Sequence, residues 1–194
     1  MTIDKQWIQK RYLPELSGKI LFVGSMPDYH NLVKTPELFE SLDFDPTAAS
    51  KGNVSPYKHH ICDFLDFQNE YTYDHISLHG LWGNGFIFKD GTLETNKTEL
   101  TKIIINSIKK AHSLLNVGGT LQIGPNTNNV NPIYEYLVSE LEYELLDRIP
   151  RSSKGCSNNI FWGKKIKNSN FTFNKENLWD IIINAIETKG LFNG

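Results

Sequence analysis

The stretch Lys19-Ile20-Leu21-Phe22-Val23-Gly24 decides the fold class of this 194-residue chain. An apolar run with β-branched and aromatic residues stops abruptly at a glycine, and such a run is typical of a strand that is buried on both faces. A strand of this kind belongs in a parallel sheet that helices cover on both sides. We therefore expect further short strands along the chain, separated by helices.

Short apolar segments at intervals predict six more strands. The last two are joined by the polar segment 150–157, which is short enough for an antiparallel connection of the hairpin type. Together they predict an α/β fold with a doubly wound, mainly parallel seven-stranded sheet and a C-terminal antiparallel hairpin. The further strands are expected at residues 39–44, 57–61, 74–78, 120–123, 142–149 and 158–166.

One helix is clear from its periodicity, since apolar side chains recur every three or four residues between Glu94 and Asn116. The glycine pair Gly118-Gly119 follows, and glycine is common just beyond a helix C-terminus. We expect one domain over residues 1–194, with an N-terminal helix within 1–17, a core over 18–167 and a helical extension over 168–194. The other helices are expected at residues 4–15, 132–141 and 175–187.

The composition argues against several classes of protein. No apolar run reaches the roughly 18 residues of a transmembrane helix. The first 16 residues are charged and amphipathic and do not resemble a signal peptide. We therefore expect a cytoplasmic protein without a membrane partner. A net charge of −2 argues against strong, sequence-blind nucleic-acid binding. Cys62 and Cys156 are the only cysteines, and the histidine spacings match no standard motif, so no metal site is expected.

The residues that directly follow the strands form the candidate site, because ligands of open α/β sheets bind beyond the carboxyl ends of the strands. They are Gly24, Asp43, Asp63, His79 and Gly124. A glycine after the first strand lets the backbone turn sharply and approach a ligand closely. The alternative for Gly24 is an ordinary turn.

Two of these residues are carboxylates with separate expected roles. Asp43 lies 19 positions after Gly24, which suits hydrogen bonds to the two hydroxyls of a ribose. The alternative is that it caps the following turn, a role that we assign to Asp45. Asp63 is placed to accept a hydrogen bond from the exocyclic amine of adenine, with Phe64 or Ile61 packing on the ring; the alternative is a helix N-cap.

His79 opens a glycine-rich, aromatic loop over residues 80–91. Histidine titrates near neutrality, which suits a general base, although a buried histidine bonded to the backbone is the alternative. Trp82 and Phe86 supply apolar area, so the loop has the composition of a lid that closes over a small substrate. The alternative is a loop that its aromatic residues pin to the core.

Together these segments resemble the class I S-adenosylmethionine-dependent methyltransferases, which have a Rossmann-like fold. The resemblance extends from about Lys19 to Lys165, and the first turn carries one glycine where the family usually has two or three. It rests on the order and spacing of residues 19–24, 41–46, 61–64, 73–80 and 111–121.

The resemblance implies that S-adenosyl-L-methionine is the cofactor. Gly24 and Ser25 are then expected near its methionine portion, and Asp43 at its ribose. Asp63 and Phe64 are expected at its adenine, and His79 beside the group that is transferred.

The resemblance also predicts the activity of a methyltransferase with a small-molecule or glycan acceptor. Residues 79–82, His-Gly-Leu-Trp, differ from the Asp/Asn-Pro-Pro-aromatic motif of enzymes that methylate amino groups of nucleic acids or glutamine. His79 is expected to take the proton of the acceptor, and Trp82 and Phe86 to line its pocket. Two alternatives stay open: transfer of an aminopropyl or aminocarboxypropyl group from the same cofactor, and a binding protein without catalysis.

Overall fold

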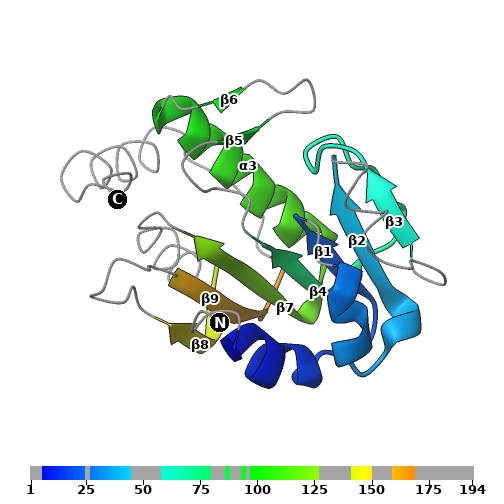
Figure 1. Cartoon of the computed structure of the whole chain (residues 1–194). Helices are drawn as coiled ribbons and strands as arrows, with labels where there is room; N and C mark the ends of the chain where they lie inside the picture. The colour runs from blue at the N-terminus through cyan, green and yellow to red at the C-terminus, as the bar shows by residue number, and fades with distance from the viewer. Residues whose placement is uncertain are drawn as a thin grey trace.

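A seven-stranded sheet forms the centre of the computed structural model, which describes residues 6–24, 27–44, 58–79, 86–87, 93–94, 97–126, 141–149 and 159–168. The strand order is β3-β2-β1-β4-β7-β9-β8; the first five strands are parallel, and β9 is antiparallel to both of its neighbours (Figure 1). This arrangement confirms the predicted fold class. The strands are β1 (Ile20–Val23), β2 (Phe39–Asp43), β3 (Lys58–Ile61), β4 (Tyr73–Leu78), β7 (Leu115–Asn126), β8 (Tyr143–Ile149) and β9 (Asn159–Lys165).

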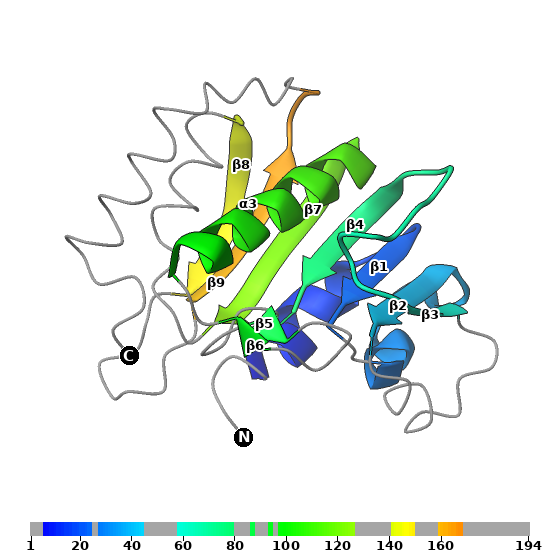
Figure 2. The ribbon, with the colours of Figure 1, turned by 90° about the horizontal axis from the view of Figure 1, so that it is seen from above.

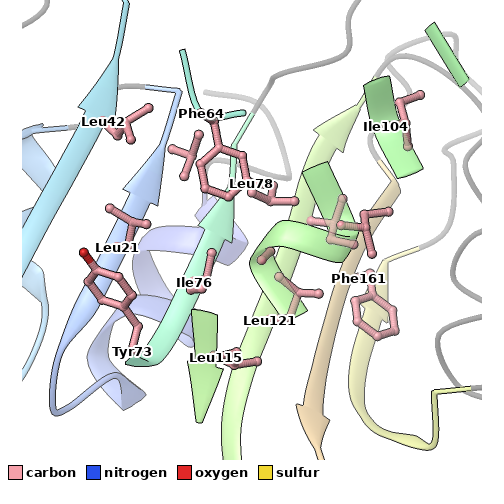
Figure 3. Packing of buried hydrophobic residues seen from close by; sticks show 14 of the residues in the cluster. Leu21, Leu42, Phe64, Tyr73, Ile76, Leu78, Ile104, Leu115, Leu121 and Phe161 are labelled. Atoms are coloured by element: carbon pink, nitrogen blue, oxygen red, sulfur yellow. The ribbon is translucent and has the colours of Figure 1, made fainter. Parts of the chain in front are cut away.

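Helix α3 (Lys97–Leu114) crosses one face of the sheet, as Figure 2 shows. Its apolar side packs with the strands in a core cluster that includes Leu21, Ile76, Ile104 and Leu121 (Figure 3). A second cluster covers the opposite face with short helical segments. These are η1 (Ile8–Tyr12), η2 (Leu13–Glu15) and η3 (Pro27–Leu32). The short segment η4 (Pro36–Leu38) has no buried residue and lies outside this cluster.

The N-terminal helix expected at residues 4–15 is formed, within the part described, by a π-helical turn and a 3-10 turn. Pro14 lies at the start of the second turn, and its ring nitrogen has no proton to continue an α-helical ladder. The helix expected at 175–187 lies outside the described residues, as does the one at 132–141 apart from Leu141. Among the described helices, none has both the length and the apolar character needed to span a bilayer.

Two boundaries differ from the sequence-based expectation. Leu93–Glu94 form strand β6 and pair antiparallel with β5 (Phe86–Ile87), so Glu94 does not begin the helix and Phe86 is not in an irregular loop. The glycine pair lies inside β7 and forms an irregularity in the pairing with β4, where Gly118 has a φ of +85°. Periodicity did not reveal these features because a two-residue strand and a bulge are too short to produce a pattern.

The C-terminal end of α3 is held by a buried lysine of strand β9. Lys165 on β9 is 2% exposed, and its Nζ donates hydrogen bonds of 2.7 Å each to the carbonyls of His112 and Leu115. These carbonyls lie at the end of the helix, where intrahelical donors are lacking. A cation there also complements the helix dipole. Lys165 therefore fixes α3 on the sheet.

A buried carboxylate on β2 links this strand to β3 and to the amino end of β4. Glu40 accepts hydrogen bonds from Tyr73 Oη (2.8 Å), from His60 Nε2 (2.7 Å) and from the Tyr71 hydroxyl. Burial alone raises the pKa of this carboxyl, but the hydrogen bonds and the charge of His60 outweigh burial and lower the pKa to about 2. Glu40 and Tyr73 lie near the amino ends of their strands, away from Gly24 and Asp43.

Glu40→Gln should lower stability at pH 7 and flatten its acid dependence. Because the pKa is lowered from 4.5 to about 2 on folding, the ionised form contributes stability above pH 4.5, and that stability is lost as the pH falls toward 2. Between pH 4.5 and pH 2, the free energy of unfolding of the wild type should fall by roughly 3 kcal/mol more than that of the variant. Urea unfolding at a series of pH values measures the difference, with Glu37→Gln on exposed η4 as the control; parallel curves for the wild type and Glu40→Gln would contradict the assignment.

Candidate functional site

Backbone hydrogen bonds beyond the ends of the strands bring the first predicted residues together. The Gly24 N–H donates to Leu42 O at 2.9 Å, and the His79 N–H donates to Val23 O at 2.9 Å. Each bond continues the ladder between neighbouring parallel strands by one residue. The carboxyl ends of β2, β1 and β4 therefore meet at one edge of the sheet.

The same edge extends to the strands on either side. Cys62 N–H donates to Asp43 O at 3.2 Å, which places the start of the turn with Asp63 beside the end of β2. On the other side Leu78 of β4 pairs with Ile123 of β7. The residues that the sequence placed after five different strands thus lie along a single edge, as expected for an α/β binding site.

Gly24 has the backbone conformation that its predicted role requires. Its φ is +90°, in the left-handed region that glycine enters without the steric cost other residues meet. The chain therefore turns sharply after β1 and continues into η3. Ser25 lies outside the described residues, so its predicted place near the cofactor stays a prediction.

Asp43 and His79 lie on the same face of the sheet. Leu42 and Leu78, the residues before them, both pack in the cluster beneath α3, so the alternation of strands directs the next residues to the opposite face. One strand, β1, separates β2 from β4, which sets their backbones about 10 Å apart. Asp43 is half-buried, whereas His79 is 7% exposed.

Tyr29 on η3 packs against His79 and was not predicted from the sequence. The two ring centroids are 6.0 Å apart at an interplanar angle of 87°, and Phe22 makes a similar edge-to-face contact with Tyr29 on the other side. Such arrangements are favourable for aromatic pairs. The imidazole is therefore held by a buried ring. Nothing local marks Tyr29, because its segment forms a 3-10 helix without apolar periodicity.

A second histidine lies close to Asp43. His59 Nδ1 and Ser41 Oγ are 2.7 Å apart, across the pairing of β2 with β3. Burial lowers the pKa of His59 below its ordinary value, although the negative charge of Asp43 opposes this shift. His59 is therefore neutral at pH 7. The sequence showed a histidine-rich neighbourhood here but did not indicate which member faces Asp43.

The turn after β3 carries the residues predicted for adenine. Asp63 is half-buried, while Phe64 is 5% exposed and packs in the core cluster near Leu42 and Leu78 (Figure 3). The Phe64 ring therefore anchors the turn, and its contact with adenine stays a prediction. Trp82 lies outside the described residues. Of Phe86 only the backbone is described, so the acceptor pocket is a prediction as well.

Several solved structures with a similar fold are methyltransferases. The N-methyltransferase NodS from Bradyrhizobium japonicum WM9 matches with a TM-score of 0.54 at 12% identity, over 78% of this chain and 88% of that one. The ribosomal protein L11 methylase from Lactobacillus delbrueckii subsp. bulgaricus matches with a TM-score of 0.56 at 12% identity, over 84% of this chain and 76% of that one. The 1,6-didemethyltoxoflavin-N1-methyltransferase from Burkholderia thailandensis was solved with S-adenosylhomocysteine. It matches with a TM-score of 0.52 at 14% identity, over 77% of this chain and 72% of that one.

No family model matches the sequence, and no curated protein matches it either. The structural likeness therefore establishes the fold: the chain has the Rossmann-like architecture of the class I S-adenosylmethionine-dependent methyltransferases. This confirms the resemblance seen in the sequence at the level of architecture. It does not by itself assign the reaction.

Tyr29→Leu should change the environment of the His79 imidazole, because it removes the ring that packs against it, whereas Tyr29→Phe keeps the ring and should leave His79 unchanged. Histidine side-chain ¹H–¹⁵N spectra, with the His79 signal assigned through His79→Gln, report the difference. Tyr29→Leu should also lose about 1–3 kcal/mol of stability through its two aromatic contacts. An unmoved His79 signal in Tyr29→Leu would show that the ring does not hold the imidazole.

Proposed function

We propose that this protein is a cytoplasmic S-adenosylmethionine-dependent methyltransferase with a small-molecule or glycan acceptor. The observation that carries the proposal is the convergence of Gly24, Asp43, Asp63 and His79 on one edge of the sheet. The fold adds support, since proteins that share it have been solved with S-adenosylhomocysteine.

The residues at this edge fit the chemistry of a nucleoside-bearing cofactor. Asp43 supplies acceptors for the two ribose hydroxyls, and Asp63 supplies one for the amine of adenine. Charge-assisted hydrogen bonds of this kind contribute about 1.5–3 kcal/mol each. The left-handed turn at Gly24 has no side chain in the way of a closely approaching ligand. Ser25, the next residue in the sequence, is assigned by this proposal to the methionine portion.

In the transfer step, His79 is the proposed general base. When bound, S-adenosylmethionine supplies an activated methyl group to a nucleophile that is held in line with it. His79 accepts the proton of that nucleophile at an imidazole nitrogen, and the Tyr29 ring limits the directions in which the imidazole can turn. Trp82 and Phe86 complete the acceptor pocket. The sequence His79-Gly80-Leu81-Trp82 favours a hydroxyl or similar group over the amine of a nucleobase.

S-adenosylhomocysteine should bind the purified protein and raise its melting temperature, because a ligand that binds the folded state stabilises it. Asp43→Asn should raise the dissociation constant about tenfold or more through loss of the charged acceptor. Isothermal titration calorimetry measures the affinity. Glu144→Gln on the exposed surface of β8 is the matched control, and it should bind like the wild type.

The possible outcomes separate the proposal from its alternatives. Absence of binding and of a melting shift at millimolar S-adenosylhomocysteine would contradict it. Binding that Asp43→Asn leaves unchanged would reject the assignment of Asp43 to the ribose. Methylthioadenosine as the product, instead of S-adenosylhomocysteine, would indicate transfer of an aminopropyl or aminocarboxypropyl group.

A further inference from the structure

The turn after β3 is fixed by a series of hydrogen bonds to consecutive carbonyls. Asp63 O accepts from the Asp66 N–H at 3.1 Å, and Phe64 O accepts from the Phe67 N–H at 3.2 Å. The next carbonyl, that of Leu65, accepts from a side chain of a distant element. All three carbonyls of this single turn are therefore satisfied, as buried or partly buried backbone groups require.

The donor to Leu65 is Lys110 of α3. Its Nζ lies 2.5 Å from Leu65 O and 5.8 Å from the centre of the Phe64 ring, so the ammonium is placed over the turn. Burial lowers the pKa of Lys110, while the charges of Asp66 and Cys62 oppose this shift. A partly buried cation is costly unless its hydrogen bonds are made, so the bond to Leu65 holds both groups in place.

This contact connects the turn to α3, the longest helix in the part of the chain that the structure describes. The sheet side of α3 is packed through Ile104, Ile108 and Ala111, which are nearly or completely buried. Phe64 and Phe67 pack in the same cluster. Two buried rings and the hydrogen bond from Lys110 therefore fix the turn on the core. Because Asp63 is the first residue of this turn, the same contacts also fix the position of its backbone.

Resting on the proposed function, we propose that Lys110 is the positioning residue for recognition of the nucleobase. By holding the Leu65 carbonyl it fixes the turn in which Asp63 meets the exocyclic amine of adenine. A carboxylate accepts from this amine but repels the carbonyl oxygen that hypoxanthine carries in its place. Lys110 therefore sets the preference of the site for adenine over hypoxanthine, although it touches neither base.

The experiment compares the binding of S-adenosylhomocysteine and S-inosylhomocysteine by isothermal titration calorimetry. The wild type should prefer the adenine compound by about tenfold or more, the effect of one hydrogen bond to a charged group. Lys110→Met should reduce this ratio to about threefold or less by freeing the turn, mainly through weaker binding of the adenine compound. Lys110→Arg restores a cationic donor and should restore the ratio.

Lys102→Met is the matched control on the same helix. Lys102 is exposed and forms an ion pair with Glu99, so its loss should leave both affinities unchanged. Circular dichroism checks that each variant is folded. Should Lys110→Met not fold, Lys110→Gln carries the same test, because its shorter side chain stays polar but does not span the distance to the carbonyl.

Each result decides between the two proposals. An unchanged ratio in a folded Lys110→Met, or a wild type that binds both compounds equally, would overturn the role of Lys110 while leaving cofactor binding intact. A wild type that binds neither compound would overturn the proposed function and this inference with it. A reduced ratio in Lys110→Met that Lys110→Arg restores would establish the positioning role, since a general loss of stability would weaken both compounds alike.

Discussion

The structure depends on the register of β1 between its two parallel neighbours. Val23 pairs with Leu42 on one side and with Leu78 on the other, so three strands reach their last buried residue at the same level. The side chains that follow are then presented together at one edge. A slip of one residue would exchange the two faces of a strand and carry its carboxylate or imidazole to the wrong side. The burial of the leucines beneath α3 prevents such a slip.

Polar contacts hold the amino ends of the strands together, opposite to the edge at which ligand binding is proposed. Asp74 accepts a hydrogen bond from the Lys19 N–H at 2.9 Å and another from Asn116 Nδ2 at 3.0 Å, so it joins β1, β4 and β7 where they begin. Gly18 is required there, because a Cβ at this position would lie 2.3 Å from Asp74 Oδ2. These contacts stabilise the end of the sheet that lies opposite to the proposed binding edge.

The sequence predicted the seven strands of the main sheet and their mainly parallel arrangement, because each strand is a local apolar run and the α/β pattern restricts the topology. It also predicted which residues stand at the carboxyl edge, since that follows from where each run stops. It did not predict Tyr29 or Lys110, because their roles arise from contacts between distant segments: Lys110 and Leu65 are 45 residues apart. No periodicity or spacing records such a contact. The sequence also did not predict the two-residue strand at Phe86, because an element this short produces no periodicity.

Two carboxylates on the same strand show how position determines role. Glu40, near the start of β2, is 8% exposed and accepts three hydrogen bonds from protein side chains, so its charge is used within the fold. Asp43, the last residue of β2, is half-buried on the opposite face, and the histidine beside it, His59, is neutral at pH 7 because burial lowers its pKa. The same chemical group thus stabilises the fold at one end of the strand and suits the recognition of hydroxyl donors at the other.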